Sequence, residues 1–268
     1  MKTFSNKNIL ITGGASGIGK IMARIFLQRK ANVILWDINE TLLNQTVSEL
    51  SSLGSINGYI IDVTNLKSIE TLSKQILDKY QFIDVLINNA GIVVGKLFNE
   101  HTLLDISKTM EINANAPMYI THAFLSSMLK NKSGHICNIA SSAGLVSNPK
   151  MSVYAASKWS VVGWSDSLRI EMEQNNTNVK VTTIMPYYIN TGMFDGVQSR
   201  IPILDPEKAA LSIVKAIEKQ KRMVTLPGYI YRFTRLGQGF LSIPLFDWFA
   251  GKVLGIYKTM ENFKGHKL

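Results

Sequence analysis

The sequence predicts a doubly wound α/β domain, in which helices cover both faces of one parallel sheet. Short apolar runs alternate along the chain with segments of helical spacing. The runs are apolar throughout, which is typical of strands buried on both faces of a parallel sheet. Alternation of strand and helix favours βαβ units with right-handed crossovers. No tract rich in Pro, Gly or Ser divides the chain.

The elements follow one another in regular order. We expect strands at residues 8–12, 33–36, 56–61, 85–87, 135–139 and 179–184. The segments between them predict helices at residues 19–29, 40–53, 67–80, 103–129 and 152–173. After residue 226 the chain becomes aromatic, apolar and basic together, and Pro244 should divide this extension into two helical pieces.

A glycine-rich turn joins the first strand to the first helix. Gly13, Gly17 and Gly19 stand in the order that a dinucleotide-binding turn requires. Gly13 allows the tight turn, Gly17 lets the backbone approach a pyrophosphate, and Gly19 lets helix and strand pack closely. The free N–H groups of the helix would face the anion. This pattern predicts a Rossmann fold that binds a dinucleotide.

The end of the second strand indicates which dinucleotide binds. Asp37 follows the glycine turn by about twenty residues, where a carboxylate accepts the ribose hydroxyls of NAD and repels a 2′-phosphate. Ser16 and Ile38 occupy positions where a basic residue would favour NADP. We therefore expect NAD, with NADP less favoured.

The next two strand ends also reach this edge of the sheet. Asp62 and Val63 follow the third strand and could flank the adenine. Asn88, Asn89, Ala90 and Gly91 follow the fourth. Two amides at a buried strand end can contact a ligand or tie neighbouring strands together, and the sequence leaves both roles open.

A tyrosine and a lysine lie one helical turn apart in Tyr154-Ala-Ala-Ser-Lys158, thirteen residues after Ser141. An unperturbed phenol has a pKa of about 10. A lysine four residues along a helix lies on the same face, and its charge favours the phenolate. With a serine hydroxyl nearby, these groups form a proton-transfer site for an alcohol and its carbonyl product.

Together these motifs resemble the short-chain dehydrogenase/reductase family over roughly residues 5–220. The resemblance implies that Tyr154 is the general acid/base and that Ser141 holds the substrate oxygen. It implies that Lys158 binds the nicotinamide ribose and lowers the pKa of the tyrosine. It also implies that Asn113 holds a water linking the lysine to solvent. Ser142 and Asn115 are the respective alternatives to Ser141 and Asn113.

The same resemblance implies a set of cofactor contacts. These are Gly13, Ser16, Gly17, Ile18, Gly19, Asp37, Asp62, Val63, Asn89, Ala90, Gly91, Tyr154, Lys158, Pro186, Ile189 and Thr191. The family often has Pro-Gly where this chain has Pro186-Tyr187, which puts contacts of residues 187–189 in doubt. Residues 35–39 and 190–194 are similar to the branch of retinol dehydrogenases and 17β-hydroxysteroid dehydrogenases. That branch implies a hydrophobic alcohol or ketone substrate.

Charge and composition bound the remaining possibilities. The net charge is +10. From Lys221 onward eight Lys and Arg face only Asp247 and Glu261, so this segment supplies +6 of it. One cysteine, Cys137, suits a reducing compartment. The histidines show no metal-ligand spacing, so we expect no metal. Residues 1–7 lead directly into the first strand, and we expect neither a signal peptide nor an anchor there.

These observations predict a catalytic Rossmann domain at residues 1–226 and a helical extension of the same domain at residues 227–268. The extension could cover the substrate, contact a membrane or contact a partner subunit. We expect a cytoplasmic homodimer or homotetramer, built on the helices at 103–129 and 152–173, that can lie peripherally on a membrane. The rival functions are a non-catalytic dinucleotide-sensing regulator and a reductase of a smaller carbonyl substrate. Nucleic-acid binding is disfavoured because no recognised motif accompanies the charge.

Overall fold

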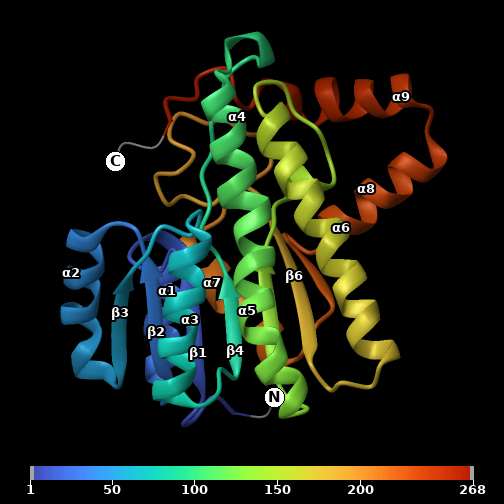
Figure 1. Cartoon of the computed structure of the whole chain (residues 1–268). Coiled ribbons are helices and arrows are strands. Elements are labelled where there is room, and N and C mark those ends of the chain that lie inside the picture. The colour runs from blue at the N-terminus through green and yellow to red at the C-terminus, as the bar shows by residue number, and fades with distance from the viewer. Residues whose placement is uncertain (1–2, 266–268) are drawn as a thin grey trace.

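A seven-stranded parallel sheet forms the centre of the computed structural model, which describes residues 3–265 (Figure 1). In sheet order the strands are β3 (Ile56–Ile60), β2 (Asn32–Asp37), β1 (Asn8–Thr12), β4 (Val85–Asn88), β5 (His135–Ile139), β6 (Lys180–Pro186) and β7 (Met223–Leu226). All six neighbouring pairs are parallel. The predicted fold class is confirmed.

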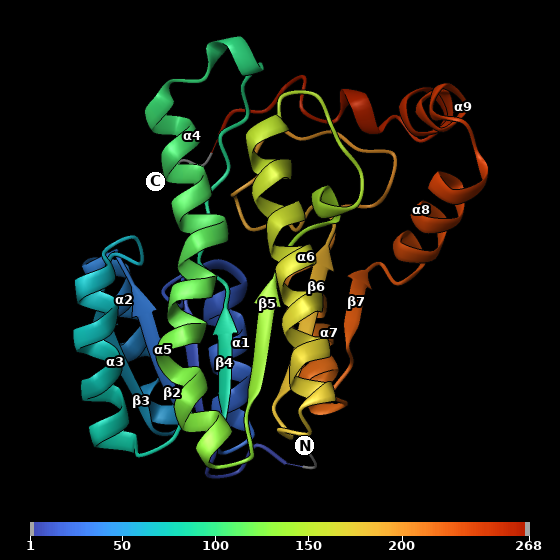
Figure 2. The ribbon, with the colours of Figure 1, turned by 45° about the vertical axis from the view of Figure 1, so that its right-hand side comes forward.

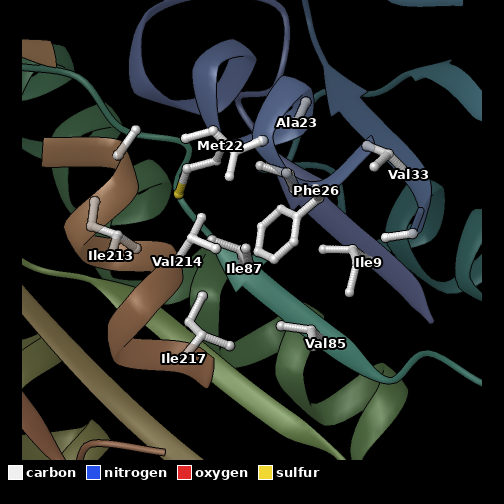
Figure 3. Packing of buried hydrophobic residues seen from close by; sticks show 14 of the residues in the cluster. Ile9, Met22, Ala23, Phe26, Val33, Val85, Ile87, Ile213, Val214 and Ile217 are labelled. Carbon is white, nitrogen blue, oxygen red and sulfur yellow. The ribbon is translucent and has the colours of Figure 1, made fainter. Parts of the chain in front are cut away.

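Helices cover both faces of the sheet (Figure 2). One face carries α1 (Gly17–Gln28), α2 (Glu40–Leu50) and α7 (Pro206–Glu218), and the other carries α3 (Leu66–Tyr80), α5 (Ala116–Lys130) and α6 (Ser152–Gln174). Figure 3 shows Phe26 of α1 pointing into the apolar layer between the sheet and the helices α1 and α7, where it lies between strand residues such as Ile9 and helix residues such as Val214. Each side chain in this layer is buried because α1 and α7 pack side by side on the strands.

The structure differs from the sequence prediction in two places. The helix expected at residues 103–129 is α4 (Leu103–Met110) and α5, joined by a π turn at Glu111–Asn115. Figure 1 shows them as one column. The strand β7 and the helix α7 were not predicted. The start of α7 could have been predicted from the sequence, because Asp-Pro is typical of a helix N-terminus. Asp205 accepts the N–H of Lys208 at 2.9 Å, and Pro206 takes the first helical position.

The carboxyl ends of the strands meet at the edge of the sheet beside α8 (Tyr229–Phe240) and α9 (Ile243–Trp248) (Figure 2). The chain winds in opposite directions from β1 and β4, so a crevice opens between their ends. The extension breaks between α8 and α9, just before Pro244, as the sequence predicted.

The last described residues turn back onto the loops at this edge. Met260 is buried, and a Cβ placed on Gly95 would lie 2.3 Å from the ring of Phe263. His266 and Lys267, which entered the histidine and charge patterns, lie outside the described residues. No helix among residues 3–265 combines the length and the apolar character that crossing a bilayer requires.

Candidate active site

The turn after β1 has the geometry that a pyrophosphate needs. Gly13 and Gly17 adopt positive φ angles of +61° and +51°, which side chains disfavour. Gly19 packs so closely that an added Cβ would lie 2.1 Å from the carbonyl oxygen of Gly13. Ser16, the N-cap of α1, makes no side-chain capping bond, so the first N–H groups of the helix remain available to an anion.

Asp37 lies at the end of β2, beside this turn. Its carboxylate accepts the N–H of Ala15 at 2.9 Å and the N–H of Asn39 at 3.0 Å, one on each oxygen. A carboxylate oxygen can accept more than one hydrogen bond, so the group can still receive ribose hydroxyls. The residues fit a dinucleotide because backbone donors face the phosphates and a fixed anion faces the ribose.

A continuous cavity of about 840 Å³ runs from this turn to the C-terminal extension. Of the expected site residues it is lined by Gly13, Ser16, Gly17, Ile18, Asp37, Asp62, Val63, Asn89, Ala90, Gly91, Ser141, Tyr154, Lys158, Pro186, Ile189 and Thr191. Gly19 and Asn113 do not line it. Lys158 is the one Lys or Arg among the described lining residues.

The two asparagines at the end of β4, Asn88 and Asn89, hold neighbouring segments together. Asn89 donates its side-chain amide to the carbonyls of Thr12 and Gly13, both at 2.9 Å. Asn88 donates to Thr121 at 3.0 Å and to Asn138 at 2.7 Å. The amides therefore tie neighbouring strand ends together, which is one of the two roles that the sequence left open.

Tyr154 lies in the first turn of α6, and this buried residue lines the cavity. Burial raises the pKa of the Tyr154 phenol to about 12, and a side-chain hydrogen bond with Ser141 acts in the opposite direction. Ser141 also accepts the N–H of Ala143 at 3.1 Å, which orients its hydroxyl. Ser142 lines the same cavity. The hydrogen bond to Tyr154 favours Ser141 as the serine of the site.

Lys158 follows one turn later on α6, also buried. Its ammonium donates to the carbonyl of Ile139 at 3.0 Å and lies 5.7 Å from the centre of the Tyr154 ring. Burial lowers the pKa of Lys158 to about 8. The lysine charge was expected to lower the tyrosine pKa, but burial raises that pKa and sets the direction of the shift.

Asn113 sits in the π turn between α4 and α5. Its amide exchanges two hydrogen bonds with the backbone of Ile92, at 2.8 and 2.9 Å, and donates to Ser157 at 3.2 Å. A Cβ on Gly91 would lie 3.2 Å from the Asn113 oxygen and 3.6 Å from the Lys158 nitrogen. Asn113 is thus a neighbour of Lys158, whereas Asn115 bonds to Glu111 instead.

The far half of the cavity has an aromatic wall that the sequence did not reveal. The ring of Phe194 lies 6.1 Å from that of Tyr154 and 5.0 Å from that of Tyr188, both edge to face. Tyr187 follows Pro186 without a positive φ, and its hydroxyl bonds to Ser199 at 2.8 Å. The extension closes this half with Tyr229, Ile230, Phe233, Thr234, Leu254 and Ile256.

Comparison with known proteins agrees with this geometry. The model of the short chain dehydrogenase family matches residues 7–201. Epidermal retinol dehydrogenase 2 of Mus musculus is 32% identical over 273 residues, which cover 99% of this chain and 88% of that protein. Estradiol 17-beta-dehydrogenase 11 of Pongo abelii is 33% identical over 238 residues, which cover 88% and 79%.

A solved structure has the same fold. The short chain dehydrogenase/reductase from Burkholderia phymatum, in complex with NAD, superposes with a TM-score of 0.82 at 25% identity, over 89% of this chain and 95% of that one. The chain therefore belongs to the short-chain dehydrogenase family, oxidoreductases that act on CH–OH groups with a nicotinamide dinucleotide, in its branch of retinol and 17-beta-hydroxysteroid dehydrogenases.

Proposed function

We propose that this chain is an NAD-dependent dehydrogenase that interconverts a hydrophobic alcohol, of retinol, steroid or lipid type, and its ketone or aldehyde. One observation carries the proposal. The Tyr154 phenol, with Ser141 and Lys158 beside it, opens into a cavity whose far walls are aromatic and aliphatic. Such walls favour a bulky apolar ligand, and the Tyr154 and Ser141 hydroxyls would hold its reactive oxygen.

Tyr154 moves the proton. With a pKa of about 12 the phenol is protonated at neutral pH, so it can donate to a carbonyl oxygen in the reductive direction. In the oxidative direction the phenolate takes the proton of the substrate hydroxyl. Ser141 donates a hydrogen bond to the same oxygen as charge develops on it. Bound NAD supplies the acceptor for the hydride that leaves the carbinol carbon.

Lys158 acts by charge and position. Below its pKa of about 8 the ammonium is positive, and it lies close enough to the Tyr154 ring to favour the phenolate. Asn113 holds residues 91–92 against this lysine through its bonds to the Ile92 backbone. We assign Asn113 the position at which a water would join Lys158 to solvent.

Asp37 supports NAD rather than NADP. A 2′-phosphate at the ribose would meet this carboxylate, and within the described residues no Lys or Arg lines the adenosine end of the cavity to offset the repulsion. Ser16, Ile38 and Asn39, which line that end, are neutral.

The test is NADH formation from NAD, with NADP in parallel, on a panel of retinol, hydroxysteroids, long-chain secondary alcohols and short polar alcohols. Tyr154→Phe should lower kcat by about a hundredfold or more without loss of NAD binding. Tyr80→Phe is the matched control, because Tyr80 ends α3 and does not line the cavity. Tight NAD binding without turnover of any alcohol would favour a dinucleotide-sensing regulator. Turnover of only the short alcohols or their carbonyl products would favour the smaller substrate.

The extension also supports contact with an anionic membrane. Phe233 lines the cavity and is 61% exposed, so the cavity opens where apolar side chains meet solvent. Phe240 and Ile243 lie at the bend between α8 and α9 and are 84% and 78% exposed. Among residues 3–265, Arg232 and Arg235 form no ion pair. Exposed apolar residues beside cations suit a surface of anionic lipid, from which an apolar alcohol could enter the cavity.

Flotation with vesicles tests this contact. The intact chain should float with vesicles containing phosphatidylserine and float less with purely zwitterionic ones. Phe240→Ser with Ile243→Ser should abolish flotation, whereas Ile60→Ser, at a position 53% exposed on the edge strand β3, should not. Equal flotation of the wild type and the double variant would remove the extension as the contact.

We also propose that the chain forms a homodimer or homotetramer. Leu103, Leu104 and Trp159 are exposed apolar residues on α4 and α6, the helices on which we expect subunits to meet. Light scattering after gel filtration should give a dimer or tetramer, and Trp159→Glu should shift it toward the monomer. A monomer at micromolar concentration would contradict the proposal.

A further inference from the structure

A buried carbonyl oxygen without a hydrogen-bond donor belongs to a residue at the wall of the substrate half of the cavity. It is Oδ1 of Asn148, a lining residue that is only 8% exposed. Within the described part of the chain no donor reaches this oxygen. A buried amide oxygen left unpaired costs free energy, so such a group is unusual unless a ligand or water completes it.

The neighbours of Asn148 fix which way its amide points. The amide nitrogen donates to the hydroxyls of Tyr188 at 3.0 Å and Thr259 at 2.7 Å. Thr259 donates its own proton to the carbonyl of Ile256 at 2.9 Å and accepts from Tyr188, also at 2.9 Å. Both N–H groups and both hydroxyls are thereby used. A flipped amide would leave two donors unpaired instead of one acceptor, so the oxygen is the free end.

Asn148 is held in a definite relation to the reacting phenol. Its backbone carbonyl accepts the N–H of Met151, the N-cap of α6, and Tyr154 lies in the first turn of that helix. On the opposite side, the rings of Tyr188 and Phe194 form an edge-to-face series that ends at the Tyr154 ring. One series of aromatic side chains therefore connects Asn148 with Tyr154.

We propose that Asn148 Oδ1 accepts a hydrogen bond from a second hydroxyl of the substrate, remote from the hydroxyl that is oxidised. This inference rests on the proposed function and narrows it. The preferred substrate is a bulky apolar molecule with two polar ends, one at Tyr154 and one at Asn148. A ketone or ether at the second end would present another acceptor to Oδ1 and would be disfavoured.

The size of the effect follows from the burial of the group. A site built to pair a substrate hydroxyl discriminates against the analogue without it, because the buried partner is then left unpaired. For a neutral hydrogen bond this amounts to a preference of about tenfold to a hundredfold in kcat/KM. The preference should vanish when the acceptor is removed.

The experiment compares two alcohols of one rigid androstane skeleton. One carries a single hydroxyl on the five-membered ring, and the other carries an additional hydroxyl on the opposite terminal ring. The wild type should prefer the diol by about tenfold or more in kcat/KM. Asn148→Leu should bring the ratio close to one by lowering the diol alone. This variant keeps the branched shape of the side chain, and Tyr188 and Thr259 retain the hydrogen bond between them.

Thr259→Ser is the matched control. Thr259 bonds to the other end of the same amide but does not line the cavity, so this variant perturbs the packing of the cluster and keeps the hydroxyl that orients the amide. The diol preference should survive in it. A ratio near one in the wild type, or the same ratio in the wild type and Asn148→Leu, would overturn the proposal.

Calorimetric binding of both alcohols, without turnover, separates this inference from the proposed function. If neither alcohol is oxidised but the wild type binds the diol more tightly and Asn148→Leu does not, the acceptor is supported and the dehydrogenase function fails. If both are oxidised with equal ratios in all variants, the function is supported and the acceptor fails. Binding of neither alcohol would contradict both.

Discussion

Replacing Gly19 by alanine tests whether close packing of α1 on its preceding turn creates the dinucleotide site. The added Cβ would lie 2.1 Å from the Gly13 carbonyl oxygen and 2.9 Å from the side-chain nitrogen of Asn89. Ordinary contact begins at 3.4 Å, so helix and turn must separate by about 1 Å. The clash is with backbone, which cannot move aside as the end of a flexible side chain can.

Two quantities should change. Overpacking of this kind costs about 1–3 kcal/mol of the free energy of unfolding. The same displacement moves the first N–H groups of α1 away from the pyrophosphate. Loss of one hydrogen bond to a charged group is worth about 1.5–3 kcal/mol, which corresponds to about tenfold or more in the Kd of NAD.

Gly163→Ala provides the matched control. Gly163 is an exposed residue inside α6, and an added Cβ there meets nothing within 4 Å. Alanine should therefore raise stability by about 0.5–1 kcal/mol, because glycine is the poorer residue inside a helix. Urea unfolding gives the stabilities and calorimetry gives the Kd of NAD for both variants. Equal stabilisation by both substitutions, with unchanged NAD binding, would refute the packing argument.

Four further predictions concern the core, the pH dependence and the cofactor. Phe26→Ala should cost about 3–5 kcal/mol in urea unfolding, because it removes a fully buried ring that meets Phe4 edge to face at 4.9 Å. Burial lowers the pKa of His135 to about 3 from 6.5, so only the unfolded state takes up a proton between these values. The free energy of unfolding should therefore decrease as the pH falls from 6.5 to about 3, by at most about 1.4 kcal/mol per pH unit. His135→Gln should flatten this dependence of stability on pH. Because burial holds the Tyr154 pKa at about 12, kcat/KM for oxidation should rise from neutral to alkaline pH while that for carbonyl reduction should not; parallel profiles in both directions check this. Asp37→Asn should reduce the preference for NAD over NADP by about tenfold, measured as the ratio of kcat/KM values, and an unchanged ratio would mean that another group selects the cofactor.

Local sequence signals singled out the residues expected to bind the cofactor, and the structure places most of them along one cavity. The glycine turn, Asp37 and the residues after β4 lie at strand ends, and in a parallel sheet all such ends reach one edge. Strand periodicity alone therefore brings them together. Tyr154 and Lys158 share a face of α6 for the same kind of reason, since helical spacing fixes their relation.

The substrate half depends on contacts between segments far apart in the chain, which no local pattern encodes. The network around Asn148 joins residues that lie 111 positions apart in the sequence. The π turn that aims Asn113 at Ile92 is invisible in a periodicity that reads as one helix. The sequence also predicted a lowered pKa for Tyr154, whereas the structure raises it. Spacing revealed the nearby charge, while burial, which dominates, is a property of the assembled fold.

The returning end of the chain has a consequence for how such an enzyme can diversify. Residues at the ends of the first four strands line the adenosine end of the cavity, whereas α8, Leu254 and Ile256 line the opposite end, with Thr259 and Met260 packed beside it. Changes in the last forty or so residues can therefore reshape substrate choice while the dinucleotide turn keeps its geometry. Exchanging this terminal segment between relatives should therefore shift alcohol selectivity and leave the Kd of NAD unchanged.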